Sequence, residues 1–148
     1  MSRQPVLRAA LAAAVLGLAT GARAQVPPSA DEARAYRGLH AAAQKGDVQA
    51  IAGASAAALQ ARDARGRTPL HVAAFARQRE AIRALAAAGA DLNALEDDRY
   101  DAVTIAAVAD DEATLRTLLA LGARAGQTTS RYDGTALIAA AHLGHDGV

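Results

Sequence analysis

The chain has 148 residues, of which 52% are hydrophobic and 3% aromatic, and it contains no cysteine. The absence of cysteine excludes a thiol nucleophile and a lipid-anchored lipoprotein. The formal net charge is +1, but three of the 16 basic residues precede Gln25 and all 15 acidic residues follow it, which leaves −2 on the remainder. A mildly acidic chain with few aromatic residues lacks the basic surface of a nucleic-acid-binding protein.

The N-terminus has the composition of a secretory signal peptide. Arg3 and Arg8 form a positively charged region before an apolar run at 9–19. Ala22-Arg23-Ala24 then supplies small residues at the expected cleavage site. The run is shorter than the roughly 20 residues of a transmembrane helix. We therefore predict that residues 1–24 are a signal peptide cleaved after Ala24, with an uncleaved anchor as the alternative. The protein is then periplasmic or secreted and makes no membrane contact after cleavage. The preference for alanine and arginine over lysine indicates a GC-rich bacterial genome.

Residues 25–32 are predicted to form a linker and the start of a helix. Val26-Pro27-Pro28 is typical of extended chain. Ser29 and Glu32 have the spacing of a capping box, in which each side chain binds the backbone N–H of the other residue. The first helix of the folded domain is expected to open here.

Four similar windows follow at a nearly constant spacing. They begin at Leu39, Leu70, Val103 and Leu137, at offsets of 31, 33 and 34 residues, and each ends in alanines. A period near 33 residues is typical of stacked helix pairs. The repeats are predicted at 33–62, 63–95, 96–128 and from 129 onward.

The second repeat shows how each unit is built. Thr68 is a candidate N-cap, and Pro69 suits the first helical position because its missing N–H has no role there. Leu70 then starts an apolar stripe of helical spacing. A second helix is expected from about 80 to 88, with Gly89 as a left-handed stop. The unit is a helix, a turn, a helix, a glycine stop and a projecting loop.

The sequence Thr68-Pro69-Leu70-His71 followed by small apolar residues resembles the signature of ankyrin repeats, and the resemblance extends over residues 33–148. It implies an all-α solenoid of stacked helix-turn-helix units with β-turn-like loops, and a protein as the partner. It also implies that His40 and His71 bridge neighbouring loops through backbone hydrogen bonds. The first, third and fourth repeats lack the Thr-Pro pair, which weakens single caps but preserves the pattern of helix pairs.

Partners of ankyrin-like domains typically contact the loop tips and the surface of the first helices. Transferring these positions gives a candidate strip along the repeats, and arginine and tyrosine are enriched in binding hot spots. The alternative is that the aromatic residues pack over the loops and between the helices. The candidates are Arg65, Arg67, Phe75, Arg77, Asp98, Arg99, Tyr100, Asp110, Arg131, Tyr132 and His142.

No combination of side chains predicts catalysis, a cofactor or a metal. His142 and His145 are three residues apart, but zinc sites require three or four protein ligands and only Asp146 lies nearby. The acidic sequence at 96–98 lacks the alternating oxygen ligands and the closing glutamate of a calcium loop, and a solvated loop tip is expected. We predict a protein that is not an enzyme.

The sequence ends after the first helix of the fourth repeat. This helix is expected to lack an outer cover, so either the chain is part of a longer protein or a partner or second copy covers the edge. The predicted function is a protein-interaction scaffold or regulator. The alternatives are a regulatory segment of a longer enzyme and a structural protein that self-associates through the open edge.

Overall fold

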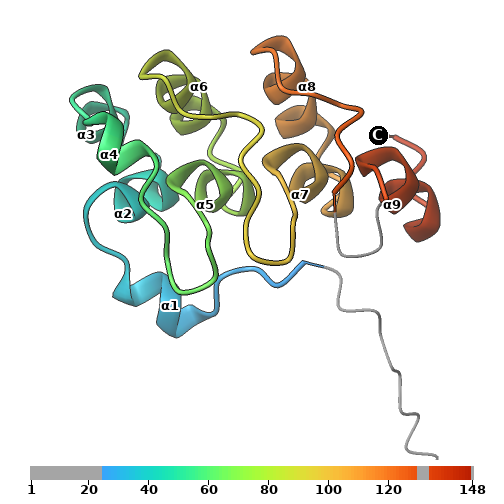
Figure 1. Cartoon of the computed structure of the whole chain (residues 1–148), viewed down its shortest axis with the longest axis horizontal. Coiled ribbons are helices and arrows are strands. Elements are labelled where there is room, and N and C mark those ends of the chain that lie inside the picture. The colour runs from blue at the N-terminus through green and yellow to red at the C-terminus, as the bar shows by residue number, and fades with distance from the viewer. Residues whose placement is uncertain (1–24, 130–133, 148) are drawn as a thin grey trace, which may run out of the picture.

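The computed structural model describes residues 25–129 and 134–147. Within these ranges the chain forms helices joined by turns, and one β-bridge pairs Thr129 with Gly134. None of these helices is long and apolar enough to cross a lipid bilayer. The predicted all-α repeat solenoid is confirmed. One layer contains α2 (Gly38–Lys45), α5 (Pro69–Phe75), α7 (Ala102–Val108) and α9 (Ala136–Leu143), and the other contains α3 (Val48–Ala52), α4 (Ala56–Leu59), α6 (Arg79–Ala87) and α8 (Glu112–Ala120) (Figure 1).

The two layers share one apolar core. Ile82 and Leu85 of α6, Ile105 of α7 and Leu118 of α8 are fully buried in it. Ala73 of α5 is also fully buried, and such small side chains let α5 pack closely between α2 and α7. Burying a leucine or isoleucine side chain contributes about 1.5–3 kcal/mol. Because these residues recur with the repeat, each helix pair depends on its neighbours for a complete core.

Polar residues cap the first helices of repeats two and three. Thr68 is the N-cap of α5, with Pro69 in the first turn. In the third repeat Asp101 takes this place, and its Oδ1 accepts from the N–H of Thr104 at 2.7 Å. Aspartate and threonine are both good N-caps. The loss of the Thr-Pro pair in repeat three therefore leaves α7 in place.

The second helix of the first repeat is divided into two. Helix α3 ends at Ala52 and α4 begins at Ala56, whereas the sequence predicted one helix pair in each full repeat. Gly53 is a poor helix former. The Ser55 hydroxyl accepts from the N–H of Ala58 at 3.2 Å and starts a new helix. Helices α6 and α8 contain neither glycine nor serine and run without a break.

The capping box opens a separate short helix, α1 (Ala30–Ala35). Ser29 N–H donates to the Glu32 carboxylate at 2.8 Å, and Glu32 N–H donates to Ser29 Oγ at 3.2 Å. The helix ends before Tyr36, and the repeat stack begins at Gly38. Helix α1 and the segment before it therefore lie outside the stack, on the side of the loops (Figure 1).

Helix α9 is covered on one side only in the described part of the chain. It packs against α7, with Ala136 and Ala140 buried. Leu137 and Ile138 are 68% and 60% exposed, respectively. This end of the stack is therefore apolar.

Candidate protein-interaction surface

The loop at 63–67 is built around one aspartate. Asp63 Oδ1 accepts from the backbone N–H groups of Arg65 and Arg67, both at 2.9 Å, and Asp63 N–H donates to Arg67 O at 3.1 Å. Gly66 has a φ of +70°, and a Cβ added to it would lie 2.2 Å from Asp97 Oδ1 of the next loop. Both the conformation and the close approach favour glycine. The loop thus has a defined shape of its own.

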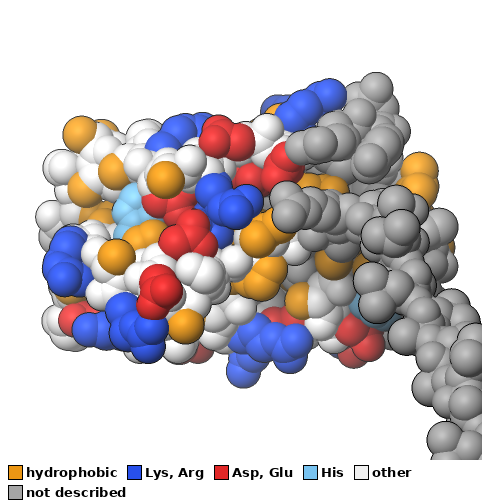
Figure 2. Space-filling view, turned by 90° about the horizontal axis from the view of Figure 1, so that it is seen from below, with side chains coloured by type: hydrophobic (Ala, Val, Ile, Leu, Met, Phe, Trp, Pro, Cys, Tyr) orange, Lys and Arg blue, Asp and Glu red, His pale blue; other side chains and the backbone are white. Residues whose placement is uncertain are grey.

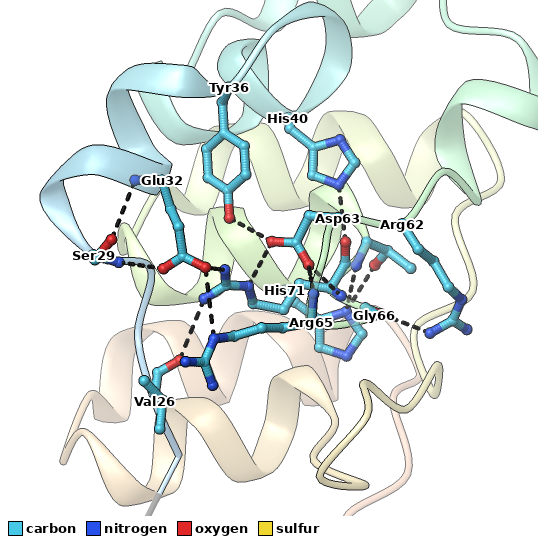
Figure 3. Close-up of polar contacts among 12 residues, drawn as sticks. Val26, Ser29, Glu32, Tyr36, His40, Arg62, Asp63, Arg65, Gly66 and His71 are labelled. Carbon is cyan, nitrogen blue, oxygen red and sulfur yellow. Dashed lines mark hydrogen bonds and ion pairs between the residues drawn. The ribbon is translucent and has the colours of Figure 1, made fainter.

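Arg67 is 1% exposed and does not offer the surface contact that the sequence predicts. Its Nε donates to Asp63 Oδ2 at 2.6 Å, its Nη2 to Glu32 Oε1 at 2.7 Å and its Nη1 to Val26 O at 3.4 Å (Figure 3). Glu32 belongs to α1, and Val26 belongs to the segment before it. The N-terminal segment therefore covers this arginine.

Tyr36 completes the same cluster by donating its hydroxyl to Asp63 Oδ2 at 2.7 Å. Burial and this hydrogen bond raise the pKa of Tyr36. Burial acts to raise the pKa of Asp63, but hydrogen bonds from Tyr36 and from the loop outweigh it and lower that pKa to about 2. Asp63 is therefore ionised at neutral pH. The sequence did not predict Glu32 or Tyr36 as parts of a site.

His40 and His71 make the bridging hydrogen bonds that the family resemblance implies. His40 Nε2 lies 2.8 Å from Arg67 O, and His71 Nε2 lies 3.1 Å from Tyr100 O. Thr68 N–H donates to His71 Nδ1 at 3.0 Å, so the neutral ring carries its proton on Nε2. Burial is the main cause that lowers the pKa of His71 to about 4. These bridges fix the spacing between successive loops.

The loop at 96–100 repeats the construction with glutamate in place of aspartate. Glu96 Oε1 accepts from Tyr100 N–H at 3.0 Å, and Glu96 N–H donates to Tyr100 O at 3.0 Å. Glu96 is 9% exposed, so it is not part of a solvated tip as expected, and burial raises its pKa. Tyr100 is 8% exposed and packs in the core, which corrects its prediction as a surface contact.

The remaining candidates differ in exposure. The Arg65 side chain is 43% exposed and lies 3.5 Å from the Glu32 carboxylate. Phe75 and Asp98 are partly buried, and Phe75 packs against the core. Arg77, Arg99 and Asp110 are exposed. Arg131, Tyr132 and the side chain of His142 lie outside the described residues.

The three exposed candidates have left-handed backbone conformations. The φ angle is +56° at Arg77, +65° at Arg99 and +51° at Asp110. Arg77 and Asp110 lie in the turns between the two helices of repeats two and three, where the first repeat has Gly46 at +75° and the fourth has Gly144 at +74°. A side chain in this conformation costs about 1 kcal/mol relative to glycine. Charged residues occupy these turns despite that cost.

Arg77 also connects the turns of repeats two and three. Its Nη2 donates to Ala109 O at 3.1 Å, and its Nε lies 3.7 Å from Asp111 Oδ2, within ion-pair distance. Asp111 caps α8 through its other oxygen, which accepts from Thr114 N–H at 3.2 Å. The two turns therefore present their side chains in a fixed relation.

The described surface carries mixed side chains and two hollows. Seen from the side of the loops, it mixes basic, acidic and hydrophobic side chains (Figure 2). An apolar hollow of about 380 Å³ lies between α7, α8 and α9, lined by residues that include Leu115, Leu119 and Leu137. A second hollow, of about 530 Å³, lies between α1 and α2 beside Arg37 and Lys45. The described residues contain no group of three or more histidine, cysteine, aspartate or glutamate side chains placed to hold a metal ion.

The stacked helix pairs, the loops bridged by histidine and the exposed turns define a helical repeat protein that displays a surface. Residues 11–96, more than half of the chain, match the family model for ankyrin repeats in three copies. The chain belongs to the ankyrin repeat family, whose members generally mediate protein–protein interactions and are typically non-catalytic. No curated protein matches it.

The matched range differs from the repeats seen in the structure at both ends. It begins inside the segment that is predicted to be a signal peptide, where Gly21-Ala22-Arg23-Ala24 has the same four letters as Gly122-Ala123-Arg124-Ala125. It ends at residue 96, before α7. The helix pair α7 and α8, and α9 after it, continue the stack beyond the matched residues (Figure 1).

Proposed function

We propose that this chain is a non-catalytic interaction module that binds a partner protein through the turns of repeats two and three, after export to the bacterial periplasm. The observation that carries the proposal is the presence of exposed Arg77 and Asp110 at turn positions where glycine would relieve the backbone. Strained backbone positions of this kind concentrate at functional sites. Export is supported by the signal-like composition of residues 1–24.

The turns are ordered before a partner arrives. Arg77 is held by Ala109 O, and the buried bridges from His40 and His71 fix the repeats on either side of α5. Phe75, partly buried two residues before Arg77, adds an apolar surface beside the charged one. Interfaces commonly combine an apolar centre with a polar rim. A partner would therefore bind with little loss of conformational freedom in this chain.

Replacing Asp110 with glycine is expected to stabilise the fold by roughly 0.5–1 kcal/mol, because glycine adopts a φ of +51° without strain. Urea denaturation at pH 7 measures the change. The matched control is Asp91→Gly, at an exposed aspartate without a positive φ, which should not stabilise the fold. A loss of stability in Asp110→Gly would show that the aspartate serves the fold and not a partner.

Affinity capture of the tagged full chain from the periplasm of a GC-rich bacterium tests the proposed binding. We expect one stoichiometric partner protein, and at least a tenfold weaker interaction when Arg77→Ala is combined with Asp110→Gly. The control is Arg83→Ala, which alters an exposed arginine on α6 in the other layer. N-terminal sequencing of the recovered chain should begin at Gln25 if export and cleavage occur.

Two outcomes would contradict the proposal. If capture recovers no protein beyond those that bind the tag alone, the chain has no partner under these conditions and the proposal fails. Equal loss of the partner in the Arg83 control would show that the turns of repeats two and three do not form the binding surface.

A second candidate function is self-association through α9, which the exposure of Leu137 and Ile138 favours. Exposed apolar patches mark interaction surfaces. Sedimentation velocity over a hundredfold concentration range should show a mass that rises with concentration, and Leu137→Asp should abolish the rise. A constant monomer mass in the unaltered chain would exclude this function.

A further inference from the structure

The side of the 63–67 loop that faces α1 resembles a carboxylate-binding site, and the chain's own N-terminal segment fills it. Arg67 Nη2 lies 2.7 Å and Arg65 Nε lies 3.5 Å from the same oxygen, Glu32 Oε1. Arg67 Nη1 donates to the Val26 carbonyl oxygen at 3.4 Å. The loop therefore binds the segment at one side-chain carboxylate and at one carbonyl six residues earlier (Figure 3). Charge-assisted hydrogen bonds of this kind are stronger than neutral ones.

The site keeps its shape through contacts inside the second repeat. Asp63 Oδ2 accepts from Arg67 Nε at 2.6 Å, which leaves Nη1 and Nη2 of the guanidinium facing the segment. Arg62 Nη1 donates to Gly66 O at 2.7 Å and to Leu95 O at 2.6 Å, so this guanidinium braces the loop from the side away from Glu32 (Figure 3). Asp97 of the next loop lies beside Gly66. Residues 62–67 by themselves hold three arginines and one aspartate and therefore carry a net positive charge.

The hold of the N-terminal segment is polar and limited. Helix α1 contains no buried residue. Segments with few buried apolar contacts open at a low free-energy cost. Tyr36, which follows α1, is held by its hydrogen bond to Asp63 and by stacking on His40. Residues 25–35 are therefore a cover that can leave while Tyr36 and the repeat stack stay in place.

We propose that the loop face formed by Arg65 and Arg67 is a recognition site for an acidic helix N-terminus of another protein, and that residues 25–35 fill this site until such a segment displaces them. The ligand carries a carboxylate in the first turn of a helix, as Glu32 does, and an extended stretch before it. This site and the turn of Arg77 lie at opposite ends of α5, so the proposal stands independently of the partner proposed for the turns.

Hydrogen exchange on the full chain tests whether Glu32 holds the cover closed. Glu32→Gln keeps a side chain that can accept from the Ser29 N–H but removes the carboxylate that Arg67 binds, whereas Ser29→Ala removes the hydroxyl of the capping box and keeps the carboxylate. We expect the N–H groups of Ala33 and Tyr36 to exchange at least tenfold faster in Glu32→Gln than in Ser29→Ala, with α6 unchanged in both. Equal rates in the two variants would overturn the role of the carboxylate.

Binding in trans tests whether the uncovered face recognises an acidic segment. The probe is a labelled synthetic peptide of residues 25–37, and its matched form carries Glu32→Gln. We expect the first peptide to bind the Glu32→Gln chain at least tenfold more tightly than the unaltered chain, and the matched peptide to bind neither. Equal binding of the first peptide to both chains, or no binding to a chain whose α1 exchanges rapidly, would overturn the recognition site.

Discussion

Replacement of Arg67 by alanine is expected to reduce the free energy of unfolding by about 3 kcal/mol. The guanidinium is 1% exposed and binds Asp63, whose side chain is 10% exposed, and Glu32, which is 31% exposed. Removing one member of a buried ion pair is costly because the remaining charge stays buried without compensation. Asp63 bears most of this cost, since opening of α1 returns Glu32 to water. Urea denaturation at pH 7 measures the loss.

Arg83→Ala is the matched control for this prediction. Arg83 pairs with Glu80 on α6, and their side chains are 48% and 74% exposed. Exposed ion pairs contribute about 0–1 kcal/mol, so the control should lose less than 1 kcal/mol. An equally small loss in Arg67→Ala would contradict the burial of the arginine cluster.

The helix pairs were predictable because their signals act over a few residues. Thr68 and Asp101 cap the helices that follow them, and the windows that begin at Leu70, Val103 and Leu137 lie in α5, α7 and α9. Capping and helical spacing depend on neighbours within one or two turns. A repeated local signal is therefore sufficient to predict a repeated fold.

The cover over Arg67 was not predictable in this way. The bond from Arg67 to Glu32 joins residues 35 positions apart, on two segments that follow no common repeat. The capping box locates Glu32 in a helix, but the direction of α1 depends on the chain at Tyr36 and Arg37, where the helix ends and α2 begins. The loop sequence is polar with or without a cover, so the transfer of family contact positions placed Arg67 at the surface.

The left-handed turns were predictable in part. Aligning the four windows places Arg77 and Asp110 at the positions of Gly46 and Gly144. Glycine in two repeats indicates a positive φ that the other two repeats share. The charged residue types conceal this requirement when each repeat is considered alone. Residue type does not show which arginines are exposed. Arg77 is exposed in a turn, whereas Arg67 is buried in a loop.

Acidification from pH 8 to pH 4 is expected to lower the free energy of unfolding by about 3 kcal/mol through His71 alone. Burial holds the pKa of His71 at about 4, whereas the unfolded chain titrates near 6.5. Between these values the unfolded state binds the proton and the folded state does not. The contribution is complete above pH 6.5 and is lost as the pH falls toward 4. The proton must enter at Nδ1, which already accepts the N–H of Thr68.

Urea denaturation of the unaltered chain and of His71→Gln at pH 8 and pH 4 isolates this contribution. Burial raises the pKa of Glu96 and Asp101, so both add stability as the pH falls toward their unfolded values of 4.5 and 3.8, which opposes the effect of His71. Asp63, with a pKa of about 2, loses its contribution only below pH 3.8. These carboxylates are present in both chains and cancel in the difference. The unaltered chain's free energy of unfolding, relative to that of His71→Gln, should therefore be about 3 kcal/mol lower at pH 4 than at pH 8. An equal pH dependence in the two chains would contradict this prediction. It would mean that the buried site of His71 tolerates a charged imidazole.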